Sequence, residues 1–125
     1  MANRPVLEPT AAHPITVEST GRHVTVLVNG ERIAETDDAL TLQESTYPAV
    51  QYIPLTDVAT ERLRPSDTQT YCPFKGDAGY YDVVTADGES VVEDAVWTYE
   101  KPYPAVSRIA GHVAFYPDKA DISVT

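Results

Sequence analysis

Apolar and polar residues alternate along much of this chain, and a period of two is typical of β-strands that bury one face. The first clear cases are residues 15–19 (ITVES), 23–28 (HVTVLV) and 31–36 (ERIAET). Asn29-Gly30 separates the last two runs, and this dipeptide is a strong hairpin signal because both residues tolerate positive φ. The pattern therefore predicts an antiparallel meander over residues 15–36.

The middle of the chain is less regular. Residues 37–45 (DDALTLQES) fit either a loop or one helical turn. Residues 55–64 (LTDVATERLR) predict one short helix, because Thr56 or Asp57 provides an N-cap and Pro65 ends the run.

Further short strands are expected between turn-forming sequences, together with one more helical turn within residues 102–111. These strands are residues 50–53, 79–85, 95–100, 112–116 and 121–125. Ten prolines and many short strands favour a compact mostly-β barrel or sandwich with short helices. We expect residues 1–13 to form an extended N-terminal tail and residues 14–125 to form a single domain.

Composition narrows the classes of function. The chain has 125 residues and a net charge of −10, from 19 acidic and 9 basic residues, so a nucleic-acid partner is not expected. No apolar run is long enough to span a membrane, and residues 1–14 do not resemble a signal peptide. The single cysteine permits no internal disulfide and no multi-cysteine zinc site, which favours a reducing cytoplasm.

The stretch TYCPFKGDAGYYD, residues 70–82, contains the chain's only cysteine and one of its three lysines. It is not a phosphate-binding loop, because Lys75 precedes Gly76 and the segment continues into a strand. Cys72 is either a lone nucleophile activated by the nearby Lys75 or a small buried residue beside a turn-forming proline. Lys75 is either a solvated turn residue or, if aromatic rings wall a cleft around it, the group that holds an anionic or carbonyl ligand. Asp77 is one candidate partner for it.

The aromatic residues are biased towards tyrosine, with eight tyrosines against two phenylalanines. Trp97 and Tyr99 alternate on one strand, so they share a face and are expected to meet Tyr80 or Tyr81 on the neighbouring strand. The result is either ordinary core packing or the wall of a ligand pocket.

The three histidines have no metal-ligand spacing, so neither a metal nor another cofactor is expected. His13 lies in the predicted tail and His23 at the start of a strand. His112 follows Gly111 close to the aromatic segment, and it is the one histidine considered for proton transfer.

Four segments resemble, in order, the signatures of the domain of unknown function family number 427. They are ESTYPAVQYIPLTDV, TYCPFKGDAGYYDV, AVWTYEKPYPAV and IAGHVAFYPDKADI, and the resemblance covers roughly residues 15–124. It implies a mostly-β, tent-like fold, present here as one copy. Members of that family have been grouped by name with nucleotidyltransferases, but this sequence has no paired-aspartate metal motif of that class.

The resemblance implies that particular residues matter for function. Glu44 is one of them, because packing alone would not require a carboxylate at this position. We expect a small-molecule-binding domain, acting as a monomer or a homodimer, with a ligand of unknown identity. The residues expected to hold the ligand are Trp97, Tyr99, Tyr80, Tyr52, Tyr47 and Asp77. The candidates for chemistry are Lys75, Cys72, Glu44 and His112. Two alternatives stay open: a small enzyme with Cys72 or Lys75 as nucleophile, and a non-catalytic protein-interaction module.

Overall fold

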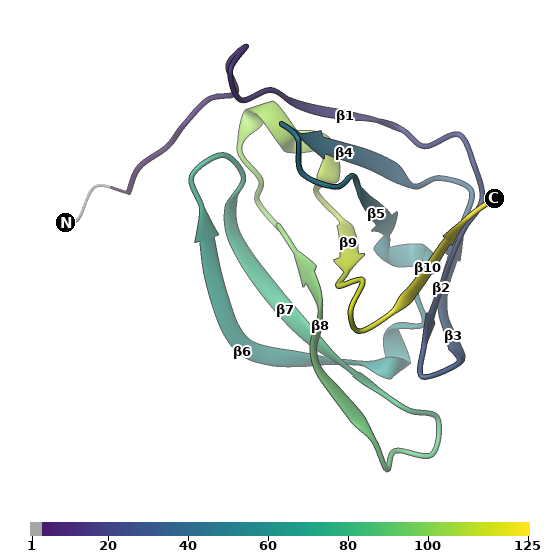
Figure 1. The fold of residues 1–125 in the computed structure, drawn as a ribbon. Helices are drawn as coiled ribbons and strands as arrows, with labels where there is room; N and C mark the ends of the chain where they lie inside the picture. Colours follow the sequence, from purple (N-terminus) through teal and green to yellow (C-terminus); the bar gives the residue numbers. More distant parts are fainter. Residues whose placement is uncertain (1–3) are drawn as a thin grey trace.

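A computed structural model describes residues 4–125, and within that range ten strands and three short 3-10 helices make up the fold (Figure 1). The strands are β1 (Ile15–Ser19), β2 (Val24–Val28), β3 (Glu31–Thr36), β4 (Leu40–Glu44), β5 (Val50–Pro54), β6 (Leu63–Cys72), β7 (Gly76–Val84), β8 (Val91–Thr98), β9 (His112–Phe115) and β10 (Asp121–Val124). The 3-10 helices are η1 (Leu55–Asp57), η2 (Thr60–Arg62) and η3 (Pro104–Ile109).

The strands form two antiparallel sheets. Seven strands pair in the order β1-β4-β5-β9-β8-β7-β6, and three pair in the order β10-β2-β3. The predicted mostly-β antiparallel class is confirmed, but the large sheet does not close into a barrel, since β1 and β6 remain at its two edges. No helix within the described range is long and apolar enough to cross a membrane.

The two predicted hairpins are present, whereas the meander over residues 15–36 is wrong. β2 pairs with β3 through Asn29-Gly30, and β7 pairs with β8. β1 does not pair with β2; it pairs with β4, with Ile15 opposite Glu44. Residues 40–44 are therefore a strand and not a helical turn, and their alternation places Leu40 and Leu42 on the face that also carries the apolar residues of β1.

The single helix predicted over residues 55–64 is also wrong. η1 and η2 are separate 3-10 turns, and Leu63 already begins β6, which continues through Pro65 along the sheet edge. Tertiary contacts explain the difference. The backbone of Ala59 donates to the carbonyl of Ile33 at 2.8 Å, and Asp57 accepts a hydrogen bond from Thr36 at 2.7 Å instead of capping a helix.

The large sheet buries both of its faces, and the pairing of β8 shows how. Val96 lies between Tyr81 and Phe115, whereas its neighbour Trp97 lies between Tyr80 and Ala114. Successive residues of a strand point to opposite faces. The face of Val96 and Phe115 packs against β2 and β3 of the small sheet and forms the first core. The face of Trp97 belongs to a second, separate core.

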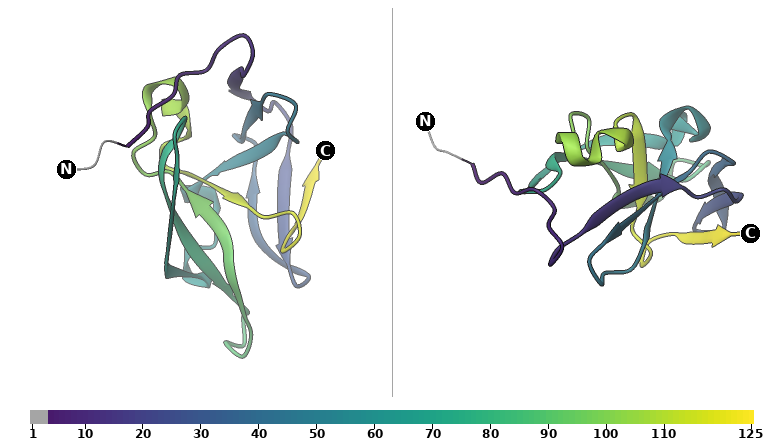
Figure 2. Two further views of the ribbon diagram at one scale, coloured as in Figure 1. Left: turned by 60° about the vertical axis from the view of Figure 1, so that its left-hand side comes forward. Right: turned by 90° about the horizontal axis from the view of Figure 1, so that it is seen from above.

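The second core is covered by η3 and by the strands at one end of the sheet. It contains eight buried residues: Leu40, Leu42, Tyr52, Ala78, Tyr99, Val106, Ile109 and Ala114. Figure 2 shows residues 4–13 running past the tip of the β6–β7 hairpin at this end of the molecule, and the backbone N–H of Leu7 donates to the carbonyl of Pro73 there.

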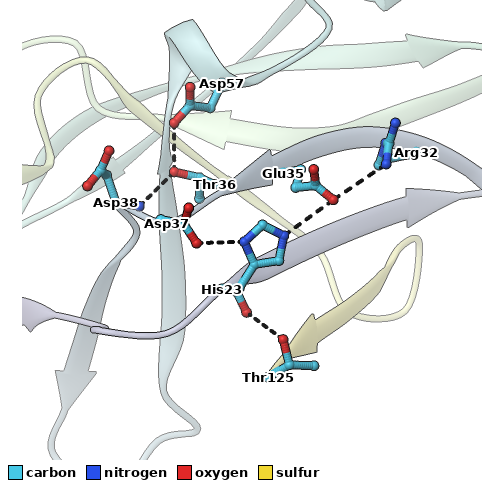
Figure 3. A network of polar contacts seen from close by, with 8 residues as sticks. All are labelled: His23, Arg32, Glu35, Thr36, Asp37, Asp38, Asp57 and Thr125. Atoms are coloured by element: carbon cyan, nitrogen blue, oxygen red, sulfur yellow. Dashed lines mark hydrogen bonds and ion pairs between the residues drawn. The ribbon is translucent and has the colours of Figure 1, made fainter.

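A polar network fastens the small sheet at the start of β2 (Figure 3). His23 Nδ1 lies 2.7 Å from Asp37 and its Nε2 lies 3.3 Å from Glu35, and the backbones of His23 and Thr125 exchange hydrogen bonds. The hydrogen bond with Asp37, followed by the contact with Glu35, raises the pKa of His23 above its ordinary value.

Phe115→Ala should lower the free energy of unfolding by about 3–5 kcal/mol, because the ring is 2% exposed in the first core and its loss leaves a cavity. Urea unfolding followed by circular dichroism measures this. Val91→Ala, at a position 37% exposed, is the control and should cost less than about 1 kcal/mol. A loss below about 1 kcal/mol for Phe115→Ala would contradict the assigned core.

His23 should titrate above the ordinary histidine pKa of about 6.5, because Asp37 and Glu35 favour the imidazolium. A raised folded-state pKa stabilises the fold fully below about pH 6.5, and this contribution is lost as the pH rises through the folded value. Proton NMR titration of the ring measures the pKa, with Asp37→Asn expected to lower it. A His23 pKa at or below about 6.5 in the parent protein would be the contrary result.

Candidate functional site

The second core opens into a cavity of about 400 Å³. Its walls come mainly from β4, β5, β7 and β8, and six of its lining residues are aromatic. The full lining is Leu42, Glu44, Tyr47, Pro48, Val50, Tyr52, Lys75, Tyr80, Trp97, Tyr99 and Tyr116. Seven of the residues expected to form a ligand or chemical site therefore lie around one hollow.

Trp97 lies at the centre of the aromatic wall. Its ring meets Tyr52 edge to face, with centroids 6.3 Å apart, and its indole N–H donates to the Tyr52 hydroxyl at 3.1 Å. Tyr116 tilts against Trp97 at 4.5 Å, and Tyr80 stacks parallel to Tyr116 at 6.4 Å. These contacts fix the indole between neighbouring strands and hold its surroundings in place.

Lys75 lies in the turn of the β6–β7 hairpin, where its backbone is held on both sides. Its N–H donates to the carbonyl of Cys72 at 3.1 Å, and its carbonyl accepts from the N–H of Tyr103 at 3.0 Å. Gly76 follows with φ of 109°, a value that L-residues with a side chain rarely adopt. The turn therefore directs the lysine inwards, and its side chain is only 11% exposed.

Glu44 occupies the last apolar-face position of β4. Leu40 and Leu42 precede it on the same face, so the strand's alternation delivers a carboxylate to the end of a hydrophobic stripe. Lys75 Nζ donates to Glu44 Oε1 at 2.5 Å, and the carboxylate side chain is 14% exposed. This ion pair forms the polar end of the cavity.

His13 completes that polar end, and sequence reasoning missed it. Its Nε2 lies 2.8 Å from Glu44 Oε2, and its ring stacks on Phe74 with centroids 4.5 Å apart. Burial by itself would raise the pKa of Glu44, but the hydrogen bonds from Lys75 and His13 outweigh it and hold that pKa below its ordinary value. His13 is 31 residues from Glu44 in sequence, so no local spacing could have revealed the contact.

Two tyrosine hydroxyls keep unused hydrogen-bonding capacity. The Tyr52 hydroxyl accepts from Trp97 and can still donate, and burial raises its pKa to about 12. Burial also raises the pKa of Tyr99. Within residues 4–125 the Tyr99 hydroxyl has no hydrogen-bond partner. Every fully buried polar side-chain atom in this range does have one, so the Tyr99 hydroxyl must be open to the cavity.

Three expected residues do not line this cavity. Cys72, the last residue of β6, is partly buried and packs against the second core without lining the cavity. His112 Nδ1 lies 2.9 Å from the carbonyl of Ala110, and the residue is not among those that line the cavity. Asp77 pairs with Arg4 and borders a different hollow, which has no aromatic lining.

Two further tyrosines line the cavity, and the sequence analysis predicts only the first of them, Tyr47, and not Tyr116. Tyr47 was expected and lies at the rim, 58% exposed. Tyr116 is a lining residue that the sequence prediction lacks, although the alternation of residues 112–116 places it on the same face as Ala114, opposite Trp97. Among the described residues, no group of three or more histidine, cysteine or acidic side chains is gathered to hold a metal ion.

Lys75→Met and Glu44→Gln should each lower the free energy of unfolding by about 2–4 kcal/mol, because either change removes one member of a largely buried ion pair. The double variant should lose less than the sum of the two single losses. Urea unfolding of all four proteins at pH 7 measures the coupling. Strictly additive losses would contradict the ion pair.

Comparison with known proteins supports one assignment. A comparison with curated proteins gives no match. Residues 16–125 match the family described as "Domain of unknown function (DUF427)". The match spans the strands of both sheets except Ile15, the first residue of β1, and all the residues that line the aromatic cavity. The chain therefore belongs to the DUF427 family.

Proposed function

We propose that the protein is a small-molecule-binding domain, and that its ligand places a ring among the cavity aromatics and a carbonyl or anionic group against Lys75. The observation that carries the proposal is a largely buried Glu44–Lys75 pair at the end of an aromatic cavity. The single cysteine further suits a reducing compartment such as the cytoplasm.

The apolar part of the cavity suits a ring. Its volume of about 400 Å³ lies within the range of roughly 300–1,000 Å³ found for small-molecule sites. Trp97, Tyr99 and Tyr80 offer ring faces and edges, and aromatic contacts favour offset or edge-to-face arrangements with another ring. A flexible aliphatic chain would also bury apolar area here, but it would not make the offset or edge-to-face contacts that favour a ring.

The polar end suits a hydrogen-bond acceptor. Lys75 uses one of its three N–H groups on Glu44, so two remain available. The hydroxyls of Tyr52 and Tyr99 can add further donors. Carbonyl and carboxylate oxygens are the natural partners of such a donor set, while Glu44 is available to accept from an N–H or O–H of the same ligand.

Binding is favoured over covalent catalysis by the placement of the two candidate nucleophiles. Cys72 does not line the cavity. Lys75 is in an ion pair with Glu44, and a lysine that carries its proton has no lone pair for attack. Neither residue combines access to a ligand with a free nucleophilic atom.

Benzamide and benzoate test the proposal, because they share a ring and differ in charge. Trp97 is the only tryptophan and lines the cavity, so its fluorescence reports occupancy. At least one probe should change the emission with a Kd near or below about 1 mM, which corresponds to about −4 kcal/mol. The stronger probe indicates whether the natural ligand is a neutral carbonyl compound or an anion.

Lys75→Met should weaken binding of that probe at least about fivefold, through loss of a hydrogen bond worth about 1 kcal/mol. Lys101→Met is the matched control, since Lys101 borders the other hollow, and it should leave binding unchanged. Circular dichroism confirms that each variant is folded. No response to either probe up to about 10 mM, or equal binding by Lys75→Met, would count against the site.

A further inference from the structure

Residues 4–13 lie against the hairpin tip that presents Lys75. The backbone N–H of Leu7 donates to the carbonyl of Pro73 at 2.9 Å, and the Tyr71 hydroxyl donates to the carbonyl of Pro5 at 2.6 Å. The Arg4 guanidinium lies 3.7 Å from the centre of the Tyr71 ring. Three separate contacts therefore hold the beginning of this segment on β6 and its turn.

The other end of the segment reaches Glu44 at the polar end of the cavity. His13 stacks on Phe74 and contacts Glu44, as described above. The carbonyl of Pro14, the next residue, accepts a hydrogen bond from the N–H of Ser45 at 2.8 Å. The segment thus connects the β6–β7 turn, which carries Lys75, to the end of β4, which carries Glu44.

The contacts that hold the segment are weak compared with the core. Arg4 also pairs with Asp77, but the two side chains are 49% and 72% exposed, and an exposed pair contributes roughly 0–1 kcal/mol. Val6 and Leu7 are 57% and 49% exposed, so little apolar area is buried along the segment. Its release would leave both cores intact.

We propose that residues 4–13 form a releasable strap, and that His13 is a positioning residue of the cavity. The docked strap holds one oxygen of Glu44 while Lys75 holds the other, which fixes the carboxylate at the polar end. Release of the strap frees that oxygen. The role in ligand binding rests on the function proposed above, whereas the hold on Glu44 does not.

The protonation of Glu44 reports whether the strap is docked. Among the described residues, His13 and Lys75 hydrogen-bond this carboxylate, and the titratable hydroxyls that share its cavity are those of Tyr47, Tyr52, Tyr80, Tyr99 and Tyr116. Of these, only His13 belongs to the strap. Burial raises the pKa of Glu44, and the contacts with Lys75 and His13 lower it. Without the His13 hydrogen bond only Lys75 lowers this pKa, so the pKa must rise.

The experiment is a ¹³C NMR titration of the Glu44 carboxyl group in the full chain. His13→Ala should raise its pKa by at least about 0.5, and His13→Gln, which keeps a donor, should restore most of the difference. Arg4→Ala loosens the strap without touching Glu44 and should raise the pKa in the same direction. Arg32→Ala, another exposed arginine paired with an acid, is the control and should change nothing.

An unchanged Glu44 pKa in either His13→Ala or Arg4→Ala would overturn the strap. Benzamide titration of the same variants tests the ligand role: at least a threefold change in Kd for His13→Ala supports it, and an unchanged Kd overturns it. If the parent protein binds neither benzamide nor benzoate, the proposed function fails, while the carboxyl titration still decides whether the strap holds Glu44.

Discussion

The structure depends on one constraint, namely that the large sheet must bury both faces although the small sheet covers only one. Val96 and Trp97 are neighbours on β8 and face different cores. On the Val96 side, aliphatic residues and Phe115 meet the small sheet. On the Trp97 side no second sheet packs within residues 4–125, and large aromatic rings, η3 and the strand ends provide the cover and leave a cavity between them.

The Glu44–Lys75 pair at the end of that cavity is difficult to explain by stability. Taking two charges out of water costs several kcal/mol per ion, and their attraction often only offsets this cost. Two apolar residues of similar size would fill the same place at no such cost. The pair does provide directed donors and an acceptor at one end of the aromatic cavity, and this is the reason that we propose a ligand there.

Local features of the sequence predict local features of the fold. Asn29-Gly30 and the alternation around it predict the β2–β3 hairpin, and the paired aromatics of β7 and β8 predict one wall of the cavity. Sequence separation limits the rest. Nothing near Ile15 indicates its pairing with Glu44, and the helix expected over residues 55–64 gives way to backbone contacts with β3. His13 reaches Glu44 because the pairing of β1 with β4 brings the two together, and its ring also stacks on Phe74 at the hairpin tip.

Native mass spectrometry tests the central claim, that the aromatic cavity with its Glu44–Lys75 end holds a small molecule. The purified protein is incubated with an extract of small metabolites, and any adduct is released by denaturation and identified. We expect one ring-containing adduct with a carbonyl or anionic group, bound one per chain and lost in Val50→Trp, which fills the cavity. The absence of any adduct, or an adduct that Val50→Trp retains, would contradict that claim.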